Sequence, residues 1–121
     1  MCAAGLRAFF NIGKVWGLDS GQEIILLGCP EKATYARWKK DPESAVPGRD
    51  VLERVSYILG IYKALQALFP EKSSADAWIR KPNGAAIFGG DSALDRMLAG
   101  NVSDLYVVRK YLDVTIYGGS R

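Results

Sequence analysis

The amino-acid sequence predicts an all-α fold. Apolar residues recur three and four positions apart along most of the chain, which is the spacing of one helix face. Polar side chains that start helices precede these stretches, and glycine or proline follows them. The length of 121 residues limits the chain to one compact domain or two very small ones.

The first third of the chain predicts three short helices. Apolar spacing places the first helix over residues 3–16. Asp19 or Ser20 is expected to cap the second helix, which breaks at residues 28–30, and the third helix covers residues 31–40. Two short helices separated by a three-residue turn have the outline of a helix-turn-helix.

A connector follows these helices. Residues 41–49 contain two prolines and a glycine, which favour turns. We therefore expect a domain boundary here, with a helix-turn-helix domain over residues 1–48 and a second helical domain over residues 49–121.

A long helix is predicted to open the second domain. Asp50 is expected to cap it, with Glu53 completing a capping box, and Pro70 is expected to end it. Its apolar residues, from Val51 to Phe69, cover much of its circumference. Such a helix must bury one flank in its own chain and another against a second element or a second subunit.

Short helices complete the second domain. Ser73 or Ser74, then Asp91 or Ser92, and finally Asn101 are the expected N-caps of three further helices. The last seven residues combine β-branched and aromatic side chains with two glycines. Because these residues extend a helix poorly, we expect an extended C-terminal tail.

The composition excludes several classes of site. The chain has no histidine, which excludes histidine-dependent catalytic triads and mixed cysteine-histidine zinc sites. Cys2 and Cys29 are too few for an all-cysteine metal site and form no C-x-x-C pair, so we expect two reduced thiols. We expect no cofactor, no metal and no catalytic residue. No apolar run is long enough to span a membrane, so we expect a cytoplasmic protein.

Two further groups of residues have structural explanations. Asp91, Asp95 and Asp104 stand at expected helix starts, where a carboxylate bonds free backbone N–H groups, and this explains them better than a metal or acid-base site. Gly89 and Gly90 also precede a helix start. Without a preceding strand they indicate a tight turn rather than a phosphate site.

The basic segment over residues 30–40 is the strongest candidate for a binding site. It holds four cations against one acid, and it lies on the second helix of the helix-turn-helix pattern, which in DNA-binding proteins enters the major groove. Alternatively, Tyr35 and Trp38 pack into the core while the cations face only solvent. If the helix reads DNA, the residues expected at base edges are Lys32, Thr34 and Arg37, and those expected at phosphates are Lys39 and Lys40.

Several segments of the chain occur in a characteristic order. The first half contains LRAFFNIGKVWGL and then TYARWKK. The second half is more specific: Trp78 is followed by the turn Arg80-Lys81-Pro82-Asn83, by Phe88-Gly89-Gly90 and by a helix that begins Ala93-Leu94-Asp95. In these features, which cover nearly the whole chain, the sequence resembles the Xre/MbcA/ParS family of bacterial type II antitoxins.

The resemblance implies a non-enzymatic protein with two binding activities. Its helix-turn-helix domain would bind operator DNA of its own operon. Its C-terminal domain would bind and neutralise a RES-domain toxin, which degrades NAD or uses it for ADP-ribosyl transfer, by covering the toxin's NAD cleft. The residues expected to contact the toxin lie in the last helix and the tail: Arg109, Lys110, Tyr111, Tyr117, Gly118, Gly119 and Arg121.

The resemblance also implies a homodimer within a larger toxin-antitoxin complex. The long helix supplies apolar surface for it, with Leu52, Val55, Leu59 and Tyr62 as expected dimer contacts. A dimer would place two recognition helices on one face of the duplex. A different interpretation is a stand-alone helix-turn-helix repressor whose second domain only oligomerises; it predicts tight operator binding without a partner.

Overall fold

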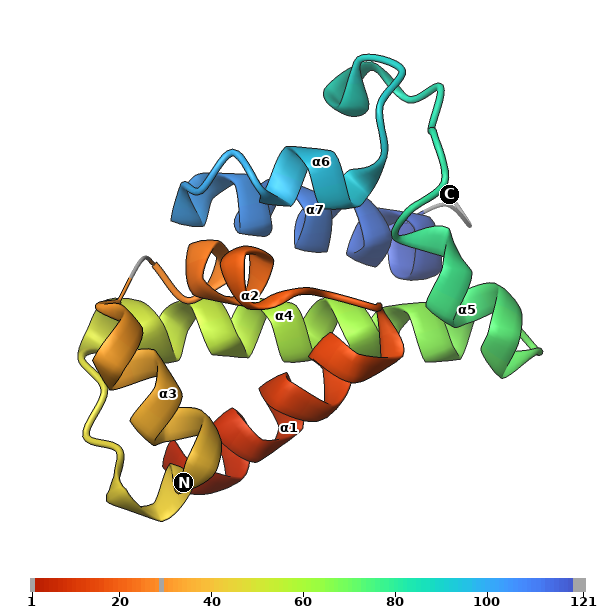
Figure 1. The fold of residues 1–121 in the computed structure, drawn as a ribbon. Helices are drawn as coiled ribbons and strands as arrows, with labels where there is room; N and C mark the ends of the chain where they lie inside the picture. The colour runs from red at the N-terminus through yellow and green to blue at the C-terminus, as the bar shows by residue number, and fades with distance from the viewer. Residues whose placement is uncertain (1, 29, 119–121) are drawn as a thin grey trace.

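The computed structural model describes residues 2–28 and 30–118, and the regular structure of these residues is helical (Figure 1). The all-α prediction is therefore confirmed. The α-helices are α1 (Cys2–Val15), α2 (Ser20–Leu26), α3 (Lys32–Lys40), α4 (Arg49–Leu68), α5 (Lys72–Trp78), α6 (Ala93–Met97) and α7 (Val102–Asp113). The 3-10 turns η1 (Pro42–Ser44) and η2 (Ala86–Phe88) lie between these helices, and the π-helical turn η3 (Val114–Gly118) follows α7.

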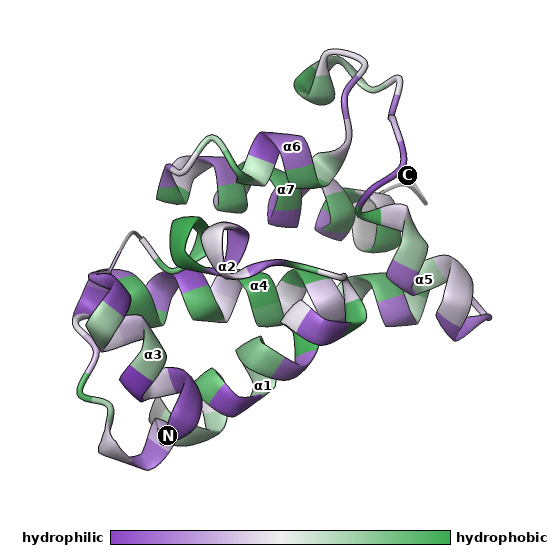
Figure 2. Cartoon of the chain, in the orientation of Figure 1, coloured by the Kyte–Doolittle hydropathy of each residue, from purple (hydrophilic) through white to green (hydrophobic). Residues whose placement is uncertain are grey.

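The long helix α4 is the central element of the fold. It crosses the middle of the molecule in Figure 1, with α1 below it and α6 and α7 above it. Hydrophobic residues recur along α1, α4 and α7 (Figure 2), and those of α4 that are buried include Ile58, Ile61 and Leu65, all fully inaccessible to solvent. The expectation that α4 buries a flank in its own chain is confirmed.

One hydrophobic cluster extends across the predicted domain boundary. It contains Phe9 and Trp16 of α1, Ile58 of α4, and Leu105 and Leu112 of α7. The predicted boundary between residues 48 and 49 coincides with the start of α4, and α1 packs against α4 across it. The division into two domains stays a prediction.

Two arginines of the second half hold backbone carbonyls at distant positions. Arg80 donates from Nε to the carbonyl of Trp16 and from Nη2 to that of Gly17, each over 2.8 Å, and so closes the C-terminal end of α1. Arg54 of α4 donates to the carbonyl of Gly100 over 2.9 Å. These bonds fix the loops around the core relative to α1 and α4.

The expected caps are confirmed where the cap and its partner are close in sequence. Asp19 accepts from the backbone of Gln22 over 2.8 Å, while the Gln22 side chain accepts from the backbone of Asp19. Ser92 and Asp95 form the same reciprocal pair at the start of α6. Asn101 is the N-cap residue of α7.

The expected starts of α4 and α5 are wrong. The N-cap of α4 is Gly48 rather than Asp50, because the Asp50 carboxylate accepts instead from Arg54 Nε, one turn further on, over 2.9 Å. The N-cap of α5 is Glu71 rather than Ser73 or Ser74, so both serines lie inside the first turn. Lys72 of that turn donates to Asp76 over 2.7 Å, which favours the earlier start.

The expected extended tail is also wrong as far as residue 118. The chain continues from α7 into the π-helical turn η3. Thr115 donates its hydroxyl to the carbonyl of Tyr111 over 2.9 Å, and Ile116 packs against the core. This local hydrogen bond and the packing of Ile116 against the core outweigh the weak helix propensity of the β-branched residues.

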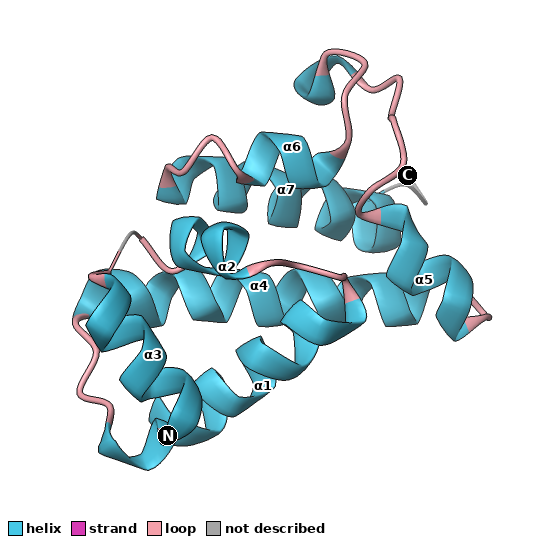
Figure 3. Cartoon of the chain, viewed as in Figure 1, coloured by secondary structure: helices cyan, strands magenta, loops and turns pink. Residues whose placement is uncertain are grey.

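The segment between α5 and α6 is the longest irregular stretch after α4. It rises away from the helices and carries the single turn η2 near its tip (Figure 3). An isolated antiparallel bridge between Pro82 and Ser92 closes its base. Gly89 and Gly90 have φ of 58° and 90°, so the tight turn expected at this pair is confirmed.

Candidate functional site

An apolar groove of about 270 Å³ lies on the outer face of α7. Tyr106 and Val114 on this groove are 48% and 51% exposed, which is high for large apolar side chains. Residues four apart share a helix face, so the groove follows one side of α7, while the opposite side is buried against α4. The lining residues are Ile87, Tyr106, Val107, Lys110, Tyr111 and Val114.

The wall of the groove opposite α7 is held by aromatic contacts. The Tyr111 ring stacks on Trp78 with ring centroids 6.4 Å apart and planes 18° from parallel. It also meets the Phe88 ring edge to face at 5.3 Å. These contacts fasten the irregular segment that carries Ile87 to α7, so the groove is a preformed surface.

Arg96 fixes the same wall through polar contacts. Its Nη1 donates to the carbonyl of Ile87 over 2.6 Å, and its Nε donates to the Asp104 carboxylate over 2.8 Å. Burial alone would raise the pKa of Asp104, but hydrogen bonds from Arg96 and from the backbone of Asn101 more than offset it and hold this pKa below its usual 3.8. Asp104 therefore stays charged near neutral pH, and its stabilising contribution is lost only as the pH falls through the lowered pKa.

The residues predicted to bind toxin differ in their surroundings. Lys110 is exposed beside the groove, and Tyr111 is partly buried in the aromatic contacts described above. Arg109 pairs with Asp113 over 3.1 Å. Gly118 ends η3, the side chain of Tyr117 is not described, and Gly119 and Arg121 lie outside the described residues.

Sequence reasoning missed the apolar part of this surface. Tyr106, Val107 and Val114 were not predicted as binding residues, nor was Ile87 of the facing segment. The signal was present in the sequence. Tyr106, Val107, Tyr111 and Val114 recur at helical spacing, in addition to the buried stripe of Leu105, Val108 and Leu112.

The basic helix α3 exposes part of the predicted DNA-binding set. Lys32, Arg37 and Lys40 are exposed, and Thr34 is half-buried. Tyr35 and Trp38 are each 6% exposed, so both pack into the core. The helix therefore presents a basic side to solvent and an aromatic side to the protein.

Lys39 differs from the other cations of α3. Its Nζ donates to Glu23 Oε1 over 2.9 Å and to the Tyr35 hydroxyl over 3.2 Å. It also lies 5.8 Å from the centre of the Phe10 ring. The hydrogen bond to Glu23 raises the pKa of Lys39 above its usual 10.5, which keeps this side chain charged.

Glu23 is the buried centre of this arrangement and was not predicted. Its side chain is 2% exposed, and it accepts hydrogen bonds from both the Tyr35 hydroxyl and Lys39. Gly13 of α1 passes so close that a Cβ there would lie 2.0 Å from Glu23 Oε2. Glu23 thus connects α1, α2 and α3, and the sequence signal was a single acid at the start of an apolar run.

The four predicted dimer contacts do not form one surface. Val55 is 4% exposed and belongs to the core, whereas Leu52 is 38% exposed. Leu59 and Tyr62 line a groove of about 350 Å³ between α1 and α4, together with the exposed Val15. The dimer stays a prediction, with Leu59 and Tyr62 as its best-placed residues.

Within residues 2–28 and 30–118, no three of the potential ligands cysteine, aspartate and glutamate gather as a metal ion would require. No described helix is long and apolar enough to cross a membrane.

Comparison with known proteins places the groove inside a recognised domain. Residues 64–118 match the antitoxin Xre/MbcA/ParS C-terminal toxin-binding domain, a range that contains η2, α7 and the groove between them. The chain is also 49% identical over 110 residues to an uncharacterised protein designated y4oB from Sinorhizobium fredii (strain NBRC 101917 / NGR234), a match that covers 91% of this chain and 82% of that protein. The chain belongs to the Xre/MbcA/ParS family of antitoxins.

Proposed function

We propose that this antitoxin neutralises a RES-domain toxin, which degrades NAD or uses it for ADP-ribosyl transfer, by binding it through the α7 groove and covering its NAD cleft. The observation that carries the proposal is the exposed apolar side of α7 inside the toxin-binding domain. Large apolar side chains in a preformed groove are the usual anchors of protein interfaces. The protein acts by binding in the cytoplasm and catalyses no reaction.

The groove and the C-terminal tail are proposed to form one continuous contact. Val114 lines the groove and is also the first residue of η3, so the groove lies directly before the tail in the sequence. Lys110 at the groove and Arg121 in the tail supply positive charge for a cleft that binds a phosphate-bearing dinucleotide.

Deleting residues 117–121 tests the part played by the tail. The deletion removes Tyr117 and Arg121 but leaves α7 and its groove, so we expect the shortened protein to bind the RES-domain toxin and to inhibit its NAD consumption at least tenfold less well. NAD consumption by purified toxin at increasing antitoxin concentration measures this. Undiminished inhibition would show that the tail takes no part and that the groove alone suffices.

The proposed second activity is operator binding by α3. Lys32, Arg37 and Lys40 share the solvent side of this helix, where they reach base edges and phosphates of DNA. A homodimer through the groove between α1 and α4 would present two such helices to successive half-sites. Autoregulation of the operon would follow from binding there.

Single substitutions on α3 separate base recognition from phosphate binding. We expect Arg37→Ala to relax the sequence preference at one position, with a loss of about 1–3 kcal/mol on the operator. Lys40→Ala should weaken binding equally on all sequences and reduce the salt dependence by about one phosphate. Competition binding with single-base operator variants measures both. An unchanged affinity for both variants would remove α3 from the DNA interface.

The interpretations as a stand-alone repressor and as an antitoxin differ in whether the protein needs a partner. The repressor interpretation expects tight operator binding by this chain alone and no effect on any toxin. The exposed groove on α7 favours the antitoxin, since a repressor that only oligomerises has no use for a second apolar surface beside the one between α1 and α4.

A further inference from the structure

A basic groove of about 340 Å³ lies between α1 and the C-terminal end of α3. Half of its lining residues are cations, and none is acidic. It is separate from the apolar groove on α7, and it adjoins the groove between α1 and α4, with which it shares Asn11. The lining residues are Arg7, Phe10, Asn11, Lys14, Lys39 and Pro42.

The three cations of this groove differ in how firmly they are held. Lys39 is fixed by Glu23 and Tyr35, which use two of the three N–H donors of its ammonium group and leave the third for a ligand. Lys14 is exposed in the last turn of α1 and forms no ion pair with any acid in the described part of the chain. The groove therefore combines a preformed cation with an uncommitted one.

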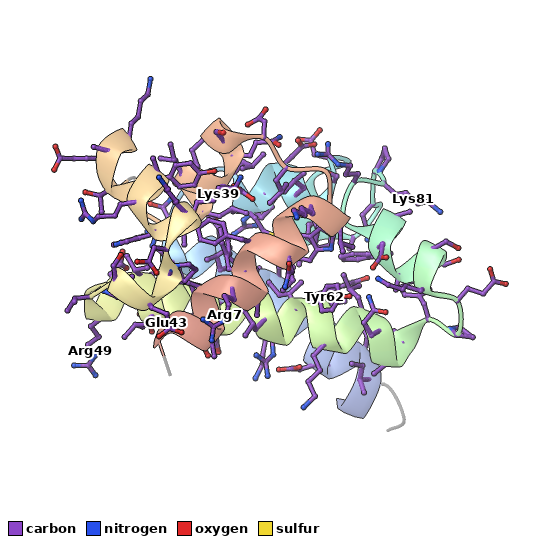
Figure 4. All side chains as sticks on the ribbon, turned by 60° about the horizontal axis from the view of Figure 1, so that its bottom comes forward. Arg7, Lys39, Glu43, Arg49, Tyr62 and Lys81 are labelled. Carbon is purple, nitrogen blue, oxygen red and sulfur yellow. The ribbon has the colours of Figure 1, made fainter. Side chains whose placement is uncertain are left out.

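Arg7 is paired but can exchange its partner. Its Nη1 lies 2.6 Å from Glu43 Oε1, and the two side chains are 52% and 71% exposed. Ion pairs this exposed contribute little, so an anion with more charge can replace the carboxylate. Figure 4 shows Arg7, Glu43 and Lys39 on the same side of the molecule, alongside α1.

The position of Lys39 makes this groove continuous with the basic side of α3. Lys32 and Lys39 are seven residues apart, nearly two full helical turns, and so lie on the same side of the helix. A duplex that faces Lys32 would have its sugar-phosphate backbone directed toward Lys39 and α1. The ligand class that fits both the charge and the position is a DNA phosphate.

We propose that Arg7, Lys14 and Lys39 bind a backbone phosphate of the DNA duplex that α3 contacts. This inference rests on the proposed DNA binding by α3 and extends the interface to α1. A phosphate contact is independent of base sequence, and each one contributes about 0.9 to the slope of log affinity against log salt concentration. The groove therefore adds affinity and fixes the orientation of the protein on DNA without adding sequence preference.

Lys14→Gln tests the groove with little risk to the fold, because Lys14 is exposed and glutamine has a similar helix propensity. The probes are a labelled duplex with the sequence directly upstream of this chain's own gene and an unrelated duplex of equal length. Fluorescence anisotropy at several salt concentrations between about 50 and 200 mM gives affinity and slope. We expect a loss of about five- to tenfold on both duplexes and a slope reduced by about one phosphate.

Two further variants make the result specific. Lys81→Gln removes the same charge from an exposed position far from the groove (Figure 4), so it should leave affinity and slope nearly unchanged. Glu43→Gln releases Arg7 from its carboxylate and should raise the affinity for both duplexes about two- to threefold.

The outcomes separate this inference from the proposed DNA binding. If the wild-type protein binds neither duplex, both are overturned. A second outcome is that the wild-type protein binds and Arg37→Ala weakens binding, but Lys14→Gln and Glu43→Gln leave affinity and slope unchanged. The groove then does not contact DNA, and only this inference is wrong. Equal losses for Lys14→Gln and Lys81→Gln would also overturn it, because the effect would then follow from net charge alone.

Discussion

Val114→Asp is expected to abolish neutralisation of the toxin while the antitoxin still folds. Val114 is 51% exposed and lines the α7 groove, so the substitution removes little from the core. In the complex it would place a carboxylate in an apolar contact without a partner, which costs about 3 kcal/mol or about 100-fold in affinity. Inhibition of the toxin's NAD consumption at increasing antitoxin concentration measures the loss.

Val46→Asp is the matched control for this experiment. Val46 is 92% exposed in the connector before α4 and lines none of the grooves described above. Val46→Asp should inhibit the toxin as well as the wild-type protein does. Thermal unfolding should show that both variants are folded. If Val114→Asp also inhibits normally, the α7 groove is not the surface that binds toxin.

Gly13→Ala is expected to lower the free energy of unfolding by about 2 kcal/mol, although alanine normally stabilises a helix interior by about 1 kcal/mol over glycine. The added Cβ would lie 2.0 Å from Oε2 and 3.1 Å from Cδ of Glu23. Glu23 is buried and held by Tyr35 and Lys39, so it cannot move aside without losing those hydrogen bonds. A fall in Tm of roughly 8 °C is the expected measurement.

Gly60→Ala is the control for Gly13→Ala, because its added Cβ would meet a flexible side chain instead of a buried one. A Cβ at Gly60 would lie 1.6 Å from Nη1 of Arg109, closer than at Gly13. Arg109 is long, and its side chain is 36% exposed, so its guanidinium can swing into solvent at the cost of a weak pair with Asp113. We expect the free energy of unfolding of Gly60→Ala to be unchanged or to rise by up to about 1 kcal/mol. Equal destabilisation by both variants would contradict the rigid role assigned to Glu23.

The sequence predicts those features of the fold that depend on residues close along the chain. The caps at Asp19, Ser92 and Asn101 follow from partners within one turn, and the glycine turn at residues 89–90 follows from glycine's backbone freedom. The prediction that Asp50 caps α4 was wrong because Arg54, also close in sequence, binds the same carboxylate. Local patterns cannot decide between two local partners.

The features that the sequence did not predict depend on contacts between distant segments. Glu23 looks like an ordinary exposed acid of a short helix until Gly13, Tyr35 and Lys39 surround it. The α7 groove exists because Trp78 and Phe88 hold the irregular segment against Tyr111. Helical periodicity identified the buried side of α7 and also places Tyr106, Val107, Tyr111 and Val114 on another side, but it could not show that this second side stays exposed and forms a groove with a distant segment.

Neutralisation of a toxin by this chain can be measured in cells as growth after co-expression with the product of the adjacent gene. Growth and cellular NAD are recorded for the neighbour alone and for the neighbour together with this chain. We expect the neighbour alone to arrest growth and deplete NAD, and we expect this chain to restore both and to co-purify with the neighbour. A neighbour that arrests growth equally in the presence of this chain, with no complex formed, would contradict this expectation.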